Sequence, residues 1–224
     1  MWRNVKAVIF DMDGVLVDSE PLWTESLVKF LARRKIKINP KNKEYKEYKR
    51  RLMGCRQVES ITFFKKLYQL KGIYQLKGRV GDLIKERKRI LFKIFRKKLK
   101  LRAGALRVIK KLNQEKIPLG LASSSSRDII EFVLNKFNLK KYFQVCLSTE
   151  EIINGKPAPD IFLKVAQKLG AEPSQCLVFE DSPRGVRAAK RAGMKCIAIL
   201  HQFNRRKDLK EADKIIACWS KLKW

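Results

Sequence analysis

Residues 5–20 read VKAVIFDMDGVLVDSE, a short apolar run that ends in an acidic cluster. An apolar run of this length is typical of a strand that is buried on both faces of a parallel sheet. Asp11 and Asp13 follow it two residues apart, so in an extended segment their side chains point to the same side. Gly14 permits a sharp turn of the backbone directly after them. The segment therefore predicts a strand with two carboxylates at its carboxyl end.

Four similar apolar runs follow later in the chain, at 117–123, 143–148, 175–181 and 195–200. Helical patterns accompany them, at 104–115, 126–137, 159–169 and 184–192. Strands that alternate with helices are typical of an α/β fold with a doubly wound, Rossmann-like parallel sheet. The chain has 224 residues, which is enough for such a core domain and a smaller inserted one.

The stretch 18–100 interrupts this alternation, because it contains no convincing buried strand. Its patterns predict helices at 22–31, 58–70 and 80–99. We therefore expect a discontinuous α/β core of residues 1–17 and 101–224, with a helical cap inserted at 18–100. Within this insertion, LYQLKG at 67–72 is nearly repeated as IYQLKG at 73–78, which we interpret as an extended helix or loop without an assigned function.

The net charge of +30 is extreme and unevenly distributed. Residues 29–102 contain 27 Lys and Arg against 5 Asp and Glu, so most of the excess lies in the helical insertion. Such a field attracts anions, either nucleic acid or small phosphorylated molecules. No helix-turn-helix, zinc-finger or RNA-binding pattern accompanies the charge, so nucleic acid stays a possible partner that is not favoured. The plainer interpretation is a set of solvated lysine side chains.

Five cysteines are present, and no two of them have CxxC spacing. Several lie inside apolar runs, which is typical of buried free thiols in a reducing cytosol. The amino-terminal residues lack the apolar stretch of a signal peptide, and no run approaches 18 apolar residues. We therefore expect a cytoplasmic protein without a membrane segment. The sequence does not determine the oligomeric state, and a monomer is the default expectation.

Polar side chains recur where the predicted strands end. The second apolar run ends in four serines, Ser123 to Ser126, and their hydroxyls together with the backbone N–H groups at a helix start suit a phosphate. Lys156 lies in the stiff turn GKPAPD, and Glu180 and Asp181 end the fourth run. Carboxylates bind Mg²⁺, and a metal ion together with a lysine neutralises phosphate oxygens. The set as a whole predicts phosphoryl transfer onto a carboxylate.

The order of these motifs is specific: DxDGxxxDSE, an apolar strand ending in Ser, GKPxPD, and a strand ending in EDS. This order resembles the haloacid dehalogenase superfamily, and most closely its β-phosphoglucomutase-like phosphatases with a helical cap. The motifs span residues 5–193, nearly the whole chain. Each motif alone is a weak signal, but all four in order and at expected strand or loop ends are a strong one.

The resemblance assigns a role to each matching position. It implies that Asp11 is the nucleophile and a ligand of Mg²⁺. Asp13 is implied to be the general acid that protonates the leaving group and then the base that activates water, while its carbonyl oxygen binds the metal. Ser123 is implied to hold the phosphate, with Ser124 beside it, and Lys156 to pair with Asp11 and phosphate.

Asp181, together with Glu180, resembles the remaining metal ligands of the family. The helical insertion would close over the substrate and exclude water. Arg56 lies at a turn before a predicted cap helix, where it could grip a second phosphate or a sugar hydroxyl, or simply add one more charge to a basic region. Ser19 has no assigned role, and His201, the single histidine, is expected in an ordinary loop.

The resemblance leaves several activities open. Hydrolysis of a small phosphorylated metabolite is the leading prediction, and a β-phosphoglucomutase-type transfer is the close alternative. Such mutases typically carry a histidine where this chain has Trp23, which favours a phosphatase. A nucleic-acid-binding protein that reuses the fold would not need both Asp11 and Asp13. A dehalogenase would leave Asp13 and the Glu180–Asp181 pair without a purpose.

Overall fold

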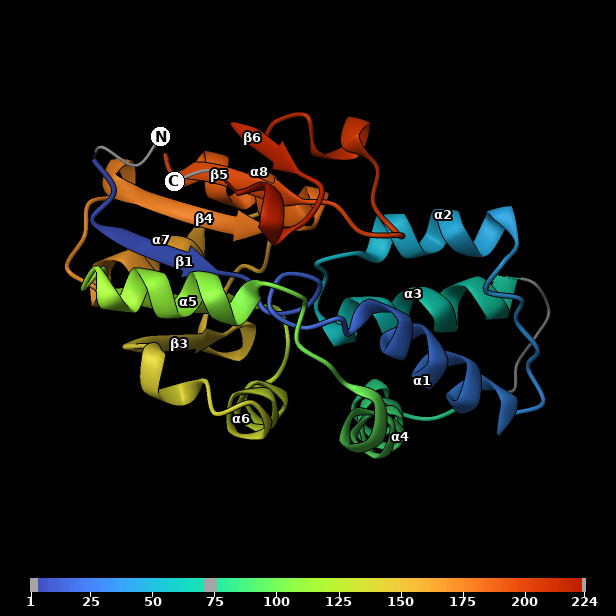
Figure 1. Ribbon diagram of the computed structural model, residues 1–224. Coiled ribbons are helices and arrows are strands. Elements are labelled where there is room, and N and C mark those ends of the chain that lie inside the picture. The colour runs from blue at the N-terminus through green and yellow to red at the C-terminus, as the bar shows by residue number, and fades with distance from the viewer. Residues whose placement is uncertain (1–3, 71–75, 223–224) are drawn as a thin grey trace.

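The computed structural model describes residues 4–70 and 76–222, and its centre is a parallel sheet of six strands (Figure 1). The strands lie in the order β3-β2-β1-β4-β5-β6, and every neighbouring pair is parallel. Their bounds are β1 Ala7–Phe10, β2 Leu119–Ser123, β3 Val145–Ser148, β4 Cys176–Glu180, β5 Lys195–Ile199 and β6 Lys214–Ile216. The order runs outward from β1 in both directions, which confirms the predicted doubly wound α/β fold.

Four helices cover the two faces of the sheet: α5 Ala105–Gln114, α6 Arg127–Lys136, α7 Asp160–Lys168 and α8 Pro183–Arg191. Alternate side chains of β1 point to opposite faces of the sheet. Val8 and Phe10 join the buried cluster that contains residues of α5 and α6, whereas Ala7 and Ile9 join the cluster that contains residues of α7 and α8. Because both faces are covered, β1 is apolar throughout, as the sequence predicts.

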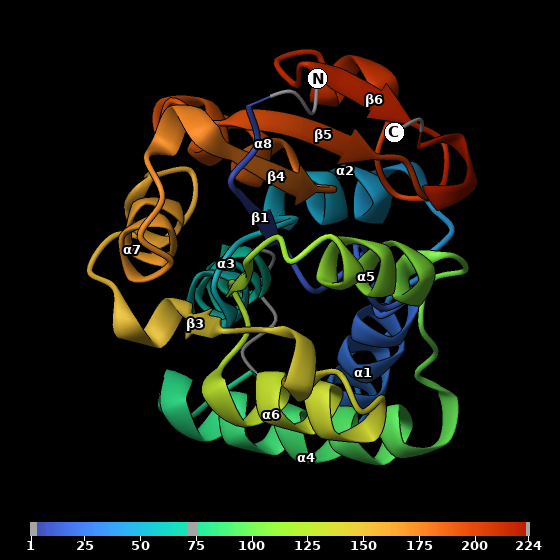
Figure 2. The same cartoon turned by 60° about the vertical axis from the view of Figure 1, so that its left-hand side comes forward.

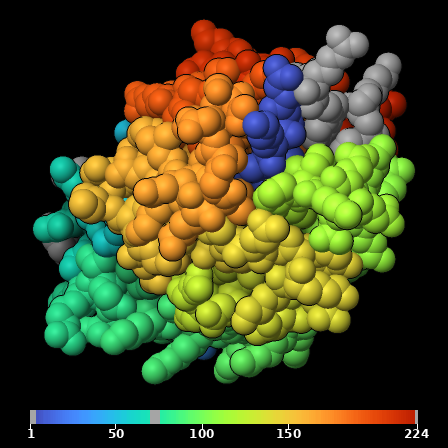
Figure 3. Space-filling model, turned by 90° about the vertical axis from the view of Figure 1, so that its left-hand side faces the viewer, coloured from blue at the N-terminus to red at the C-terminus, as the bar shows by residue number. Residues whose placement is uncertain are grey.

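Four further helices lie between β1 and α5 in the chain and form the second body of the molecule (Figures 1 and 2). They are α1 Glu20–Ala32, α2 Lys43–Leu52, α3 Gln57–Leu70 and α4 Val80–Lys98. We call them the cap. In Figure 2, α4 runs beneath α6, and in Figure 3 the green spheres of the cap lie along the lower edge, below the yellow α6 region. The remaining regular elements are short 3₁₀ turns, η1 Lys140–Tyr142, η2 Thr149–Glu151, η3 Pro173–Gln175, η4 Arg206–Leu209 and η5 Trp219–Lys221.

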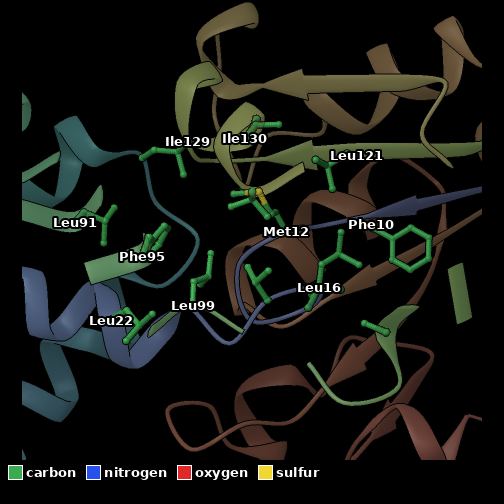
Figure 4. Packing of buried hydrophobic residues seen from close by; sticks show 14 of the residues in the cluster. Phe10, Met12, Leu16, Leu22, Leu91, Phe95, Leu99, Leu121, Ile129 and Ile130 are labelled. Atoms are coloured by element: carbon green, nitrogen blue, oxygen red, sulfur yellow. The ribbon is translucent and has the colours of Figure 1, made fainter. Parts of the chain in front are cut away.

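Cap and core share one apolar cluster (Figure 4). It extends from Phe10 of the sheet through Met12 and Leu99 at the junction to Phe95 of α4, and each of these side chains is at most 4% exposed. Burial of such side chains stabilises a fold by about 1.5–3 kcal/mol each. The cluster therefore holds the cap against the carboxyl ends of the central strands.

Two elements were missed by the sequence patterns. Helix α2 has the sequence KEYKEYKRRL and buries only Tyr45. Its sequence therefore lacks the repeated apolar residues that indicate an amphipathic helix. Strand β6 has three residues and lies at the edge of the sheet. Part of the LYQLKG and IYQLKG duplication lies outside the described residues.

The structure also tests two expectations about the chain as a whole. All five cysteines are free thiols, but only Cys176 and Cys196 are fully buried. Among residues 4–70 and 76–222, none of the helices combines the length and the apolar character that a bilayer crossing requires.

Candidate active site

Lys156 connects the ends of two neighbouring strands. Its Nζ donates to Asp11 Oδ1 after β1 and to Glu180 Oε1 at the end of β4, each at 2.6 Å, and to the carbonyl oxygen of Ala122 at 3.1 Å. Burial alone would lower the pKa of this lysine, but Asp11 and Glu180 outweigh burial and raise it. The ammonium is therefore a permanent charge, and it fixes the orientation of the Asp11 carboxylate.

Burial also dominates the electrostatics of Asp11. It raises the pKa of the carboxyl well above its usual value, Lys156 opposes this, and the neighbouring carboxylates Glu180, Asp181 and Asp13 add to the rise. One ammonium thus faces four carboxyl groups at this edge of the sheet. The site has the excess of negative charge that a cation would offset.

Glu180 is fully engaged by the protein. Its second oxygen, Oε2, accepts from the backbone N–H groups of Asp181 and Ser182 and from the Ser182 hydroxyl, at 2.8, 2.9 and 3.0 Å. With Oε1 on Lys156, both oxygens have partners in a side chain that is 0% exposed. This geometry does not fit the prediction that Glu180 is a direct metal ligand, because the Glu180 carboxylate instead binds Lys156 and the residues at the start of α8.

Asp13 is surrounded by hydrogen-bond donors. Its Oδ1 accepts from Ser19 Oγ at 2.6 Å and from Trp23 Nε1 at 2.9 Å, and its Oδ2 accepts from Ser125 Oγ at 2.7 Å. Burial raises the pKa of the Asp13 carboxyl, and these three donors partly oppose the rise. A carboxyl held in this way can exist in either protonation state without moving, which suits a proton carrier.

The sequence analysis expected none of the three donors to contact Asp13. Ser19 belongs to the DSE segment and Ser125 to the run of four serines after β2, so both lie inside motifs that were recognised for other residues. Trp23 was considered only because it stands where related mutases typically have a histidine. Its indole comes from α1 of the cap, so a cap residue contacts Asp13 directly.

Asp181 contacts His201, and the expectation that His201 is an ordinary loop residue is wrong. The distance from His201 Nε2 to Asp181 Oδ2 is 2.7 Å, and both side chains are less than a tenth exposed. Burial raises the pKa of the Asp181 carboxyl well above its usual value and lowers that of His201 to about 4. His201 follows β5, so the rule that ligands lie at carboxyl ends of strands would have found it.

The serines after β2 divide into two roles. Ser123 is fully buried at the end of the strand, and its Oγ accepts from the backbone N–H of Ser125 at 3.1 Å. Ser124 lines the cavity beside Asp11 and donates from Oγ to the carbonyl oxygen of Gly54 in the cap at 2.9 Å. Ser126 is the residue that precedes α6. The turn thus brings backbone and hydroxyl groups to the same edge as Asp11.

Arg56 lies away from the cavity. Its Nη2 donates to the carbonyl oxygen of Ile153 at 2.7 Å, and Gly155 lies against the guanidinium. Arg56 is not among the residues that line the cavity over Asp11. The prediction that it grips the substrate is therefore wrong in this structure. Through Nη2, Arg56 joins the cap to the loop before Lys156.

A cavity lies between the two bodies, and we call its two walls the core wall and the cap wall. The core wall is formed by Asp11, Asp13, Ser124, Ser125, Asp181 and Ser182. The cap wall is formed by Glu20, Trp23, Leu27, Tyr45, Lys49, Leu52, Met53, Gly54, Cys55, Gln57, Ser60, Phe64 and Arg87. The walls differ in character, because the first is acidic and polar whereas the second mixes aromatic, aliphatic and charged side chains.

Of the charged residues of the cap wall, Glu20 and Arg87 are buried and Lys49 is largely buried. Glu20 and Lys49 form an ion pair in which neither side chain is more than 14% exposed. Although burial favours the neutral carboxyl, Lys49 outweighs it and lowers the pKa of Glu20. Arg87 donates to the carbonyl oxygen of Trp23 at 3.1 Å and lies 5.3 Å from the centre of the Trp23 ring. Burial lowers the pKa of Arg87 to about 10.

The donor set fits a divalent cation held by oxygen atoms. Within the described part of the chain, no three His, Cys, Asp or Glu side chains converge as a ready-made metal cluster. However, Asp11 Oδ2 and Asp181 Oδ1 accept no hydrogen bond from any described residue, and the same is true of the Asp13 carbonyl oxygen. Two carboxylate oxygens and one carbonyl oxygen are hard ligands of the kind that Mg²⁺ takes alongside water.

Comparison with known proteins identifies the class. Residues 5–193 match the family model of the haloacid dehalogenase-like hydrolases. The match covers most of the chain, so the chain belongs to this family.

Individual relatives narrow the class further. The chain is 36% identical over 211 residues to a phosphorylated carbohydrates phosphatase of Thermotoga maritima, covering 93% of this chain and 91% of that protein. It is 36% identical over 208 residues to a protein of Drosophila melanogaster named probable pseudouridine-5'-phosphatase, covering 88% and 82%. The crystal structure of a β-phosphoglucomutase from Clostridium difficile has the same fold, with a TM-score of 0.81, 22% identity and coverage of 98% and 94%. Both of the relatives with 36% identity are named phosphatases.

Proposed function

We propose that the protein is a Mg²⁺-dependent phosphatase that hydrolyses a small phosphate monoester through an aspartyl-phosphate on Asp11. The observation that carries this proposal is that two carboxyl groups in one cavity, those of Asp11 and Asp13, have different hydrogen-bond partners. Asp11 is held by an ammonium, whereas Asp13 is held by three neutral donors. A pair of carboxyl groups in different environments can divide the roles of nucleophile and proton carrier.

In the first half of the reaction, a carboxylate oxygen of Asp11 attacks phosphorus and the bond to the leaving oxygen breaks. Lys156 keeps the carboxylate in place through Oδ1 and offsets negative charge beside it. Asp13, in its protonated form, gives its proton to the leaving oxygen, and Ser19, Trp23 and Ser125 then stabilise the carboxylate that results. The alcohol leaves and Asp11 carries the phosphoryl group.

In the second half, Asp13 acts as the base. It takes a proton from a water molecule, the water oxygen attacks phosphorus, and the bond to Asp11 breaks. Inorganic phosphate is released, and both aspartates return to their starting states. Asp11, Asp13 and Asp181 are the residues that would hold Mg²⁺, the second of them through its carbonyl oxygen. When bound, the ion supplies positive charge that neutralises phosphate oxygens.

The cap wall supports a substrate with hydroxyl groups. A carboxylate, an ammonium, a guanidinium and an amide face the cavity beside aromatic rings, from Glu20, Lys49, Arg87, Gln57 and Trp23. The Gln57 Oε1 atom is buried and has no hydrogen-bond partner among the described residues, so it can accept from a ligand. We infer a small phosphorylated metabolite, and residues 18–100 as the cap that closes over it. The five free thiols support a cytoplasmic setting.

Trp23 favours hydrolysis over a mutase reaction. A mutase must keep water from its phosphoenzyme until the second sugar oxygen arrives. The donor on Asp13 here is an indole N–H at 2.9 Å, which cannot exchange a proton with the carboxylate as an imidazole can. If incubation with β-glucose 1-phosphate and Mg²⁺ yields glucose 6-phosphate rather than free phosphate, this choice is wrong.

The nucleophile can be tested by exchanging Asp11. We expect Asp11→Asn to lower the turnover of p-nitrophenyl phosphate by more than about 1,000-fold. Asp18→Asn is the matched control, because Asp18 is an exposed aspartate of the same segment and should keep native turnover. An Asp11→Asn protein that remains active would end the proposal.

The two roles of Asp13 predict a second signature. An aryl phosphate needs little help from an acid, so Asp13→Asn should still release p-nitrophenol once. The water step then lacks its base, so release should stop after about one equivalent per enzyme. Intact-mass measurement should find the phosphorylated protein, and digestion should locate the phosphoryl group on the peptide that contains Asp11. Steady turnover without a burst would contradict the role of Asp13.

A further inference from the structure

The loop after β5 surrounds Asp181 with hydrogen-bond donors. His201 contacts the Asp181 carboxylate at 2.7 Å. Asn204 donates from Nδ2 to the carbonyl oxygen of Asp181 at 2.7 Å and to that of Ile199 at 3.0 Å. The Asn204 amide oxygen accepts from the backbone N–H of His201 at 3.0 Å, so the Asn204 side chain fixes the backbone at His201. Both ends of Asp181, main chain and side chain, are thus fixed by one short loop.

The tautomer of His201 follows from its second contact. The backbone N–H of Phe203 donates to His201 Nδ1 at 3.1 Å, so this nitrogen is an acceptor without a proton. The proton of the neutral ring therefore lies on Nε2, the atom that faces Asp181 Oδ2. His201 Nε2 is therefore the donor and Asp181 Oδ2 the acceptor.

The opposite side of the carboxylate is closed by backbone. A side chain at Gly14 would overlap Asp181 Oδ2, so the turn after Asp13 passes directly against this oxygen. With Oδ2 taken by His201 and enclosed by Gly14, Oδ1 is the oxygen that no described residue binds. The Asp181 carboxylate is thus held in one orientation, with Oδ1 available to a ligand.

We propose that His201 is a positioning residue for the metal site: by holding Asp181 Oδ2, it presents Oδ1 as a ligand of the divalent cation. Asn204 supports it by fixing the loop. The inference rests on the proposed function insofar as Asp181 is a metal ligand, but it concerns binding of the cation and not the chemical steps. Outer partners of this kind orient ligands, and their removal typically weakens metal binding about 10- to 100-fold.

The direct test measures metal binding without substrate. Binding of Mn²⁺ is followed by electron paramagnetic resonance and binding of Mg²⁺ by calorimetry, in the full-length chain. We expect His201→Leu to weaken both by about 10- to 100-fold and His201→Gln, which keeps a donor, to recover most of the loss. Gln202→Leu, an exposed position of the same loop, is the control with native affinity. Equal affinities in the native protein and His201→Leu would overturn the proposal.

The kinetic counterpart separates positioning from folding. In His201→Leu, the Mg²⁺ concentration for half-maximal activity should rise by the same factor, while kcat at saturating Mg²⁺ stays near the native value. A loss of kcat that saturating Mg²⁺ does not restore would contradict a positioning role. If native protein binds the ions but His201→Leu binds them equally well, the proposal fails and the phosphatase function stands. If native protein binds neither ion, the metal dependence of the proposed function fails as well.

A second measurement needs no variant, which matters if His201→Leu does not fold. His201 is the single histidine, so the imidazole signals of ¹⁵N-labelled protein belong to it without assignment. We expect the spectrum of the neutral Nε2–H tautomer, and broadening of these signals when Mn²⁺ is added. The opposite tautomer, or signals that Mn²⁺ leaves unchanged, would overturn the proposal.

Discussion

A lysine accompanies each wall of the cavity, and the two lysines differ in what surrounds them. Lys156 lies behind the core wall, where its side chain is 1% exposed and contacts two carboxylates, Asp11 and Glu180. Lys49 of the cap wall is 14% exposed and pairs with Glu20 alone. The Lys156 ammonium donates to three protein oxygens, whereas Lys49 lines a cavity that a ligand can fill. We therefore propose that the core wall carries the chemistry and that the cap wall recognises the substrate.

The largest effect is expected at Lys156. Lys156→Met removes the ammonium that pairs with two buried carboxylates, so the free energy of unfolding should fall by about 3–5 kcal/mol. Turnover of p-nitrophenyl phosphate should fall by at least about 100- to 1,000-fold, because Asp11 loses its orientation and the phosphate loses a positive charge. Urea denaturation and steady-state kinetics measure the two losses.

Lys49→Met is the matched comparison for that variant. It also removes a buried ammonium, but it leaves a single carboxylate in a wall that borders the cavity. We expect it to keep most of the turnover of p-nitrophenyl phosphate, because this substrate has no hydroxyl group that Glu20 could bind. If Lys49→Met abolishes turnover as completely as Lys156→Met, the division between a chemical wall and a recognition wall is wrong.

The same division explains what the sequence predicts well. The residues of the core wall follow the strands, and parallel strands bring their carboxyl ends to one edge of the sheet. Local patterns therefore placed Asp11, Asp13 and Asp181 at this edge in a chain whose fold was also predicted correctly, and the motifs added Ser123 at the end of β2 and Lys156 in the loop before α7. The roles that these residues carry stay predictions until they are tested.

The residues of the cap wall could not be predicted from the sequence in the same way. Its charged residues come from three different helices, with Glu20 on α1, Lys49 on α2 and Arg87 on α4. In a region with 27 basic residues, the sequence does not show which two turn inward, because this depends on helix packing. Arg56 was chosen for its turn and lies outside the cavity, whereas Lys49 lies on α2, a helix that was not predicted.

The second effect concerns substrate selection at the cap wall. For the sugar or polyol phosphate that proves best in a substrate panel, Glu20→Gln should lower kcat/KM by about 10- to 100-fold, mainly through KM, because a charged hydrogen-bond acceptor is lost. Lys46→Met is a control on the exposed side of α2 and should leave kcat/KM unchanged. A fall in kcat with unchanged KM would instead place Glu20 among the residues that act on the reacting atoms.

The third effect concerns Trp23, the residue that joins the two walls. Its ring lies against Phe95 and beneath Arg87, and its Nε1 donates to Asp13. Trp23→Phe keeps an aromatic ring and removes only the donor, so kcat should fall by about 10-fold while KM changes little. Measuring kcat with an alkyl phosphate makes the test strict, because such a leaving group depends most on the acid. An unchanged kcat would show that Ser19 and Ser125 suffice to hold Asp13.

The smallest effect is expected where cap and core meet at the surface. Lys88 of α4 pairs with Asp128 of α6 at 2.8 Å, and Asp128 also accepts from Ser126 at 2.6 Å. Burial would raise the pKa of Asp128, but Lys88 and Ser126 outweigh it and lower the pKa. A carboxyl whose pKa is lowered by folding stabilises the folded state above its unfolded pKa, and this contribution is lost as the pH falls through the folded pKa.

Because the Asp128 side chain is 49% exposed, the pair should contribute less than about 1 kcal/mol, and salt should reduce it. Asp128→Asn should therefore unfold at slightly lower urea concentration than the native protein at pH 7, and the difference should vanish at strongly acidic pH. Lys88→Met should show the same dependence, since the pair needs both charges. If Asp128→Asn is destabilised equally at neutral and acidic pH, the contribution comes from the hydrogen bond with Ser126 and not from the ion pair between cap and core.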